Sequence, residues 1–205
     1  MLTKPLKALL LLILLGMPVL FYLFLQSFGE NQYEIPVYYQ EGIPEQLPGC
    51  EQGEVPHSLN PFFQNDICGI WPCSELKGKQ TIISLVKSDC QDQVISQVAR
   101  INNIFRDEPA FHSVTLPLDS VANPELIYQQ RRLYAIPEGL WSWWSYQKET
   151  DNLVRCGLNQ NLDCISTNKV ILVDKHYKIR GVYTISDVEE MDRLVTEFQI
   201  LLAET

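Results

Sequence analysis

One cysteine of this sequence stands where proteins build reactive thiols. Residues 80–86 (QTIISLV) are an apolar run, and Cys90 follows them just before a polar, helix-like stretch. The dipole and the unpaired backbone N–H groups at a helix N-terminus favour a thiolate. A thiol-redox site needs a second cysteine nearby, but positions 91–94 are Gln, Asp, Gln and Val. Asp89 and Asp92 flank Cys90, and their negative charge disfavours the thiolate.

The other cysteines could form disulfides with Cys90 or with one another. The disulfide candidates are Cys50, Cys68, Cys73, Cys90, Cys156 and Cys164. This number of cysteines fits an oxidising compartment, although sequence alone does not determine the pairing. Local spacing favours Cys68 with Cys73 and Cys156 with Cys164, which leaves Cys50 and Cys90. A zinc site is not expected, because the sequence contains no pair of Cys-x-x-Cys units.

Three interpretations of Cys90 stay open at this point. It could be a half-cystine bonded to Cys50, an inert buried thiol, or a reactive thiol with Cys50 as its resolving partner. The histidines, His57, His112 and His176, are expected to be structural or surface residues rather than metal ligands.

The N-terminal segment is expected to anchor the chain in a membrane. No charged residue occurs from Ala8 to Leu25, and a run of about 18 apolar residues is just long enough to cross a bilayer as a helix. A cleaved signal peptide is the alternative, but its apolar core is shorter, roughly 7–15 residues. Lys4 and Lys7 precede the run, so the N-terminus should stay in the cytoplasm. The rest is then expected in the periplasm of a cell with an inner membrane.

The charge of the exported part excludes one class of partner. The formal net charge is −9, and residues 1–26 contain two lysines and no acid, so residues 27–205 carry −11. An acidic domain of this kind is not expected to bind nucleic acid. We expect three regions: a cytoplasmic N-terminus and anchor (1–26), a tether and irregular lead-in rich in proline (27–56), and a folded domain (57–205).

The folded domain shows alternating strand and helix patterns. In residues 91–106, Val94, Val98, Ile101 and Phe105 recur at helical spacing. The tryptophans of 140–146 are expected to pack into the core rather than form a docking surface. The expected elements are strands at 80–86, 112–118, 170–174 and 178–184, helices at 91–106, 124–134, 149–155 and after the capping box Ser186–Glu189, an extended segment at 140–146, and a hairpin from 57–64 and 70–73.

A strand–helix–strand unit followed by a strand–strand–helix unit is the order of a thioredoxin-like fold. The fold class predicted from the sequence is therefore α/β, with a central mixed sheet flanked by helices and preceded by a transmembrane helix. In that fold the first long helix begins at the carboxyl end of a central strand. This is the place that Cys90 occupies in the predicted order.

Over about residues 55–203, the sequence resembles the Sco/SenC family of membrane-anchored thioredoxin-fold proteins. The segments that carry the resemblance are SELKGK (74–79), PLDSVANPELI (117–127), WSWWSYQKETDNLVRCGL (141–158) and VILVDKHYKIRGVYTISDVEEMDRLVTEFQILL (170–202). The resemblance implies a link to copper delivery, thiol redox and cytochrome oxidase assembly.

The resemblance also shows which functional residues are replaced. The family binds copper with two cysteines and one histidine, soft ligands that suit Cu(I). The first family cysteine falls on Cys90, the second on Val94, and the histidine on Ser166. Cys164, two residues before Ser166, is the alternative ligand. We therefore expect no cofactor, and copper only if Cys90 binds it.

These observations lead to two expected functions. The first is a non-enzymatic accessory or interaction protein of the cell envelope, with a respiratory oxidase or its assembly factors as the partner. The alternative is an active thiol-redox or copper-delivery protein that uses Cys90.

Overall fold

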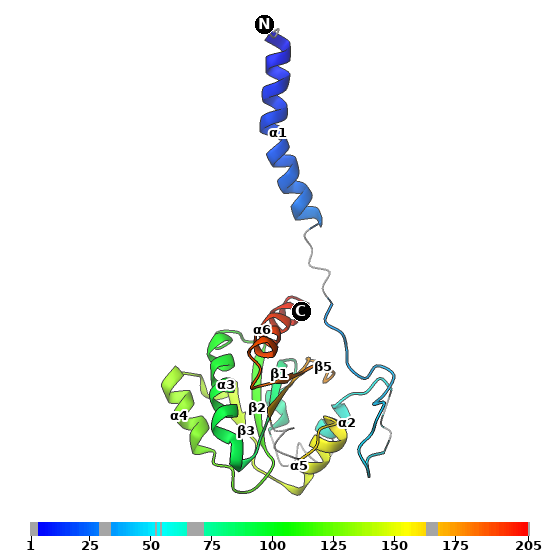
Figure 1. The fold of residues 1–205 in the computed structure, drawn as a ribbon, viewed down its shortest axis with the longest axis vertical. Coiled ribbons are helices and arrows are strands. Elements are labelled where there is room, and N and C mark those ends of the chain that lie inside the picture. Colours follow the sequence, from blue (N-terminus) through cyan, green and yellow to red (C-terminus); the bar gives the residue numbers. More distant parts are fainter. Residues whose placement is uncertain are drawn as a thin grey trace. The chain divides into compact units, whose positions relative to one another are not determined.

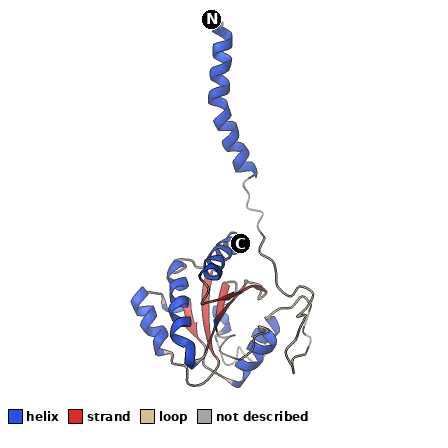
Figure 2. Cartoon of the chain, in the orientation of Figure 1, coloured by secondary structure: helices blue, strands red, loops and turns tan. Residues whose placement is uncertain are grey.

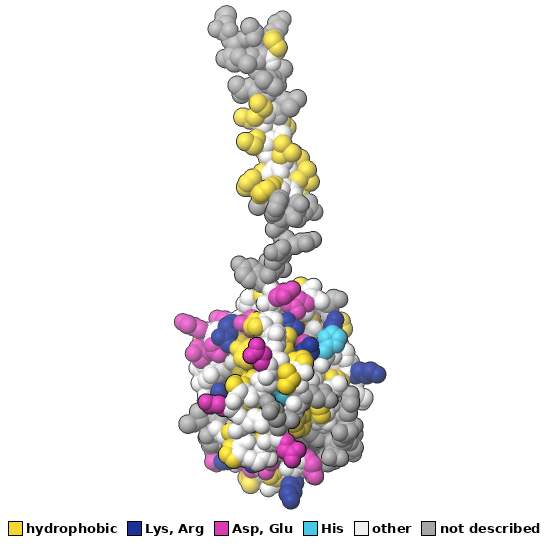
Figure 3. All heavy atoms as spheres, turned by 90° about the vertical axis from the view of Figure 1, so that its right-hand side faces the viewer, with side chains coloured by type: hydrophobic (Ala, Val, Ile, Leu, Met, Phe, Trp, Pro, Cys, Tyr) yellow, Lys and Arg dark blue, Asp and Glu magenta, His cyan; other side chains and the backbone are white. Residues whose placement is uncertain are grey.

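The chain forms two compact units. The computed structural model describes residues 4–28, 34–51, 53, 55–64, 72–162 and 168–204. The units are Met1–Glu34 and Ile35–Thr205. The first contains the 25-residue helix α1 (Lys4–Phe28). Between Ile13 and Phe24, the large apolar side chains of α1 are each more than half exposed (Figure 3).

Among the described residues, no helix is both long enough and apolar enough to cross a bilayer. The transmembrane helix expected within residues 1–26 is therefore not confirmed and stays a prediction.

The second unit is built on a five-stranded mixed sheet with the order β3-β2-β1-β4-β5 (Figures 1 and 2). Strands β1, β2 and β3 run parallel to one another, while β4 is antiparallel to both β1 and β5. The strands are β1 (Gln80–Val86), β2 (Phe111–Pro117), β3 (Trp141–Trp143), β4 (Lys169–Val173) and β5 (Ile179–Thr184). The helices are α2 (Asn60–Gln64), α3 (Gln91–Ile104), α4 (Glu125–Tyr134), α5 (Lys148–Asn152) and α6 (Val188–Ala203), with short helical turns η1 (Cys73–Glu75), η2 (Ser88–Cys90), η3 (Glu138–Leu140) and η4 (Leu153–Gly157). This confirms the predicted α/β fold with a mixed sheet.

The sheet is buried on both faces, and each face has its own core. Side chains of β1 alternate between the two cores, since Ile82 and Val86 belong to one and Ile83 and Leu85 to the other. Helices α3, α4 and α6 cover the first face, and α2, α5 and η4 lie on the second (Figure 1). The apolar runs that predict β1 and β4 are therefore strands buried on both sides.

The aromatic segment packs inward, as the sequence predicts. Trp141 is fully buried, and its Nε1 donates a hydrogen bond to Thr115 Oγ1 at 2.9 Å. Trp144 is also buried, at 1% exposure, on the opposite face of the sheet. Trp143, the third tryptophan of the segment, is partly buried. The segment forms the edge strand β3 rather than an exposed aromatic patch.

Two local predictions were wrong. Residues 57–64 do not form a hairpin strand. Ser58 Oγ accepts a hydrogen bond from Asn60 N at 3.2 Å, and Pro61 occupies the first turn of helix α2. Residues 65–71 lie outside the described part. Helix α6 is capped by Asp187 rather than by Ser186. The Asp187 carboxylate accepts from two backbone N–H groups of the first turn, and a charged acceptor there also interacts favourably with the helix dipole.

The described residues between Ile35 and α2 form no helix or strand, yet they pack against the sheet of the second unit. Ile35 is 5% exposed and belongs to the first core. Tyr38 N donates to Ile179 O at 2.8 Å, next to β5. Buried Arg180 donates to Ile35 O at 2.6 Å and pairs with Asp174 at 3.2 Å. Side chains of the sheet thus hold the lead-in in place.

Candidate functional site

The turn between β1 and α3 carries Cys90. Strand β1 leads through Lys87 into the short turn η2, and Cys90 is the N-cap residue of α3. Its backbone N–H donates to Lys87 O at 3.0 Å. Cys90 is partly exposed and present as a thiol. The structure therefore places this cysteine at the helix N-terminus that the sequence predicts, and it contradicts the half-cystine interpretation of Cys90.

Asp119 links this turn to the loop that follows β2 through hydrogen bonds. One carboxylate oxygen accepts from Ser88 N and Ser88 Oγ at 3.0 and 2.9 Å, and the other accepts from Val121 N and Ala122 N at 3.1 and 2.8 Å. Burial alone would raise the pKa of Asp119, but the hydrogen bonds from Ser88, Ala122 and Val121 lower it below its ordinary value. Because both of its oxygens are engaged, Asp119 positions the Cys90 turn and is not available as a base or a ligand.

The first turn of α3 supplies no second sulfur. Val94, where the family resemblance places the second cysteine, is 1% exposed and belongs to the first core. Ser166 and Cys164 lie outside the described residues. Within the described ranges, no group of three or more histidine, cysteine or carboxylate side chains is placed to hold a metal ion. Among the residues that the structure describes, Cys90 is therefore the one soft ligand at this turn.

The three histidines lie on other elements. His57 is buried, and its Nε2 donates to Gly157 O at 2.7 Å. His176 is exposed in the turn between β4 and β5, where its backbone N–H donates to Asp174 Oδ1 at 2.9 Å. His112 is fully buried in β2. Each has a position that fits the structural or surface role expected from the sequence.

His112 is buried as a neutral imidazole. Its Nε2 lies 3.6 Å from Glu75 Oε2, and neither ring nitrogen makes a hydrogen bond of normal geometry with a described residue. Burial, with a smaller contribution from the positive charge of Lys79, lowers the pKa of His112 to about 4 despite the opposing effects of Glu75 and of the Gly139 backbone. The folded protein therefore resists protonation at this position.

We expect the stability of the chain to fall as the pH is lowered from about 6.5 to about 4. The pKa of His112 is depressed in the folded state, so the unfolded chain binds the proton first and acid favours unfolding. The loss from this residue is about 3 kcal/mol. Denaturant unfolding of the wild type and of His112→Leu across this pH range measures it. The variant should show a shallower loss, while His176→Gln should follow the wild type; equal slopes for all three would contradict the prediction.

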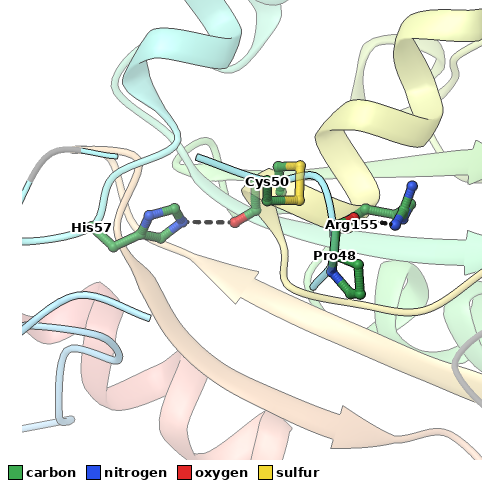
Figure 4. Close-up of a disulfide and its surroundings, with 6 residues drawn as sticks. Pro48, Cys50, His57 and Arg155 are labelled. Atoms are coloured by element: carbon green, nitrogen blue, oxygen red, sulfur yellow. Dashed lines mark hydrogen bonds between the residues drawn. A yellow bond between two sulfur atoms is a disulfide. The ribbon is translucent and has the colours of Figure 1, made fainter. Parts of the chain in front are cut away.

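The cysteine pairing differs from the one that local spacing favours. Cys50 is bonded to Cys156, 106 residues away in sequence, with the two Cα atoms 5.3 Å apart (Figure 4). The expected Cys156–Cys164 and Cys50–Cys90 pairs are therefore wrong. Cys73 is disulfide-bonded, but the expected partner, Cys68, lies outside the described residues. The physical reason for the difference is that the lead-in folds back onto η4, which brings distant cysteines together.

Two further contacts accompany the bridge. Arg155 Nη2 donates to Pro48 O at 2.7 Å, and His57 bonds to Gly157 next to Cys156 (Figure 4). A pocket of about 130 Å³ lies at this place and is lined by both cysteines, His57 and Arg155. The sequence contains no local signal for this cluster, because its members come from residues 48–57 and 155–157.

Comparison with known proteins adds the fold relationship. No protein-family model and no curated protein sequence matches the chain. One similar solved structure is BsSco, a member of the Sco family of cytochrome c oxidase assembly proteins in which a disulfide switch was identified. It is 9% identical over 86% of this chain and 100% of that chain, with a TM-score of 0.51. Another is a SCO1/SenC family lipoprotein from Bacillus anthracis, 13% identical over 62% of this chain and 84% of that chain, with a TM-score of 0.48.

Identities this low establish the fold alone. The chain has a thioredoxin-like fold that it shares with a Sco protein, which confirms the resemblance predicted from the sequence at the level of the fold.

Proposed function

We propose that this chain is a membrane-anchored, periplasm-facing, Sco-like accessory protein that performs neither copper nor dithiol chemistry at the Cys90 turn. The observation that carries the proposal is the buried Val94 on the first turn of α3, where a second sulfur would be needed. Cu(I) is bound well by several soft ligands together, and a reversible internal disulfide needs two cysteines. One sulfur at this turn meets neither requirement.

The anchor is supported by the sequence and by the surface of α1. Residues 8–25 contain no charged residue, and the described apolar side chains of α1 are exposed. Exposed apolar area costs free energy in water and is stabilised in a lipid environment. Carbonate extraction of isolated membranes tests this part, since release of the full chain into the supernatant would contradict an anchor.

The partner is proposed from the similar fold. BsSco belongs to a family of cytochrome c oxidase assembly proteins, and we extend that role here to a respiratory oxidase or its assembly factors. The folded region is acidic, so the partner surface is expected to be neutral or basic.

A Cu(I) titration tests the proposal. In the presence of the competing chelator bathocuproine disulfonate, the oxidised full chain should retain no stoichiometric copper, and Cys90→Ser should behave identically. One thiolate cannot compete with a chelator that supplies several ligands. Retention of one equivalent by the wild type and its loss in Cys90→Ser would overturn the proposal and support a copper carrier.

One observation favours the second candidate function, thiol-redox activity at Cys90. Cys90 is a partly exposed thiol at the N-terminus of a 14-residue helix, and thiol–disulfide exchange requires such access to the sulfur. The rate of alkylation by iodoacetamide at neutral pH distinguishes the two functions. An accessory role predicts a rate close to that of glutathione, and a much faster rate would favour the redox function.

A further inference from the structure

The Cys50–Cys156 disulfide is open to other molecules. Both cysteines are partly exposed and line the pocket of about 130 Å³. Cys73, the other described half-cystine, is instead buried at 8% exposure. Thiol–disulfide exchange requires direct access of one sulfur to another. Among the described half-cystines, Cys50 and Cys156 are therefore more accessible than Cys73.

His57 supplies a proton acceptor at this pocket. A carbonyl oxygen can only accept, so the 2.7 Å contact with Gly157 O fixes the proton of the neutral ring on Nε2 and leaves the lone pair on Nδ1. A Cβ atom on Gly53, which also lines the pocket, would lie 4.0 Å from Nδ1. The basic nitrogen thus faces the Gly53 side of the pocket.

Arg155 supplies positive charge on the other side of the bridge. Figure 4 shows the disulfide between His57 and Arg155. Arg155 directly precedes Cys156, and its hydrogen bond to Pro48 O holds the guanidinium group beside the Cys50 segment. Positive charge near a cysteine favours its thiolate form. Glu51 also lines the pocket, and its negative charge acts in the opposite sense.

We propose that Cys50 and Cys156 are a second redox couple of this chain, and that their dithiol form reduces a disulfide of a partner protein at this pocket. The proposal goes beyond the function proposed above, which concerns the Cys90 turn.

Electron transfer to the partner takes two thiol–disulfide exchanges. The proton of the Cys50 thiol passes through water in the pocket to His57 Nδ1, which faces the Gly53 side, and the Cys50 thiolate attacks one sulfur of the partner disulfide. A Cys50–partner bond forms, the partner bond breaks, and the released thiolate takes the proton back from the imidazolium by the same route. Cys156 then loses its proton to water, and its thiolate attacks the Cys50 sulfur. The Cys50–Cys156 bond forms, and the released second partner thiolate takes up a proton from water. Two electrons pass to the partner, and a protein dithiol upstream must return the couple to its reduced form.

The fold sets the direction of electron transfer. In the bridged state the two Cα atoms lie 5.3 Å apart, a separation suited to a disulfide. The contacts of Arg155 and His57 hold the two segments together independently of the bridge. Closing the bridge from the reduced native state therefore needs little reorganisation, so the disulfide form is favoured and the dithiol acts as the electron donor.

The experiment uses the full chain carrying Cys90→Ser in detergent micelles. Limited dithiothreitol first reduces the Cys50–Cys156 bridge, and oxidised glutathione is then added as the probe disulfide. Mass spectrometry should show two glutathione thiols released per chain and the Cys50–Cys156 bridge restored. Adding Cys156→Ser should trap glutathione on Cys50. His57→Gln, whose amide can still donate to Gly157 O, should slow the reaction at neutral pH at least about tenfold, and the difference should vanish at alkaline pH. His176→Gln is the matched control and should react as the parent.

A measurement on the unmodified chain keeps the proposal testable if a variant fails to fold. During partial reduction by dithiothreitol, Cys50 and Cys156 should become accessible to alkylation at least about tenfold faster than Cys73. Equal or faster labelling of Cys73, no glutathione on Cys50, or an unchanged rate in His57→Gln would overturn the proposal. The copper titration reports on Cys90 and not on Cys50 or Cys156. A failure of the proposed function is therefore distinguishable from a failure of the redox couple proposed in this section.

Discussion

Replacing both Cys50 and Cys156 with serine is expected to lower the free energy of unfolding by about 4–5 kcal/mol. The bridge spans 106 residues of sequence, and closing a loop of that size removes much conformational entropy from the unfolded chain. The same free energy favours the disulfide over the dithiol in the folded protein, which agrees with an electron-donating couple. Guanidinium unfolding of the full chain in detergent, followed by tryptophan fluorescence, measures the loss.

Cys90→Ser is the matched control, because it changes a partly exposed cysteine that closes no loop. Its effect should stay below about 1 kcal/mol. If the double serine variant loses no more than this control, the unfolded chain must already be compact around the bridge, and the entropic account of this disulfide fails.

The second large effect is expected at Arg180. Replacing it with methionine should lower the free energy of unfolding by about 3–5 kcal/mol, because breaking a buried ion pair leaves a charge without compensation. Arg180 Nη1 lies 3.2 Å from Asp174 Oδ2, and the two side chains are only 10% and 4% exposed. Its Nη2 also donates to Ile35 O at 2.6 Å and to Glu204 Oε2 at 3.0 Å. The substitution therefore also removes one of the contacts that hold the lead-in on β5.

Two further variants identify the cause of that loss. Arg100→Met removes an ion pair with Asp192 whose side chains are 52% and 65% exposed, and it should cost less than about 1 kcal/mol. Adding Asp174→Asn to Arg180→Met removes the buried charge and should recover part of the stability. No recovery would show that the lost contact with Ile35, rather than the uncompensated carboxylate, dominates.

Local patterns in the sequence were sufficient for most of the fold. The apolar runs of β1 and β4 and the helical spacing of Val94, Val98 and Ile101 predict elements that the structure contains. These patterns work because the side-chain period of a strand or helix depends on neighbours within a few residues. The errors at residues 57–64 and at Ser186 arose where side-chain hydrogen bonds to the backbone decided between two local conformations.

The sequence by itself determined the order of strands and helices, the thioredoxin-like fold class and the place of Cys90 at a helix N-terminus. Only the tertiary structure decided the partner of Cys50, the burial of His112 beside Glu75, and the pocket that joins His57 and Arg155 to the disulfide. The reason is physical. Hydrophobic periodicity acts between residues close in sequence, whereas a disulfide or a buried charge depends on which distant segments the folded chain brings into contact.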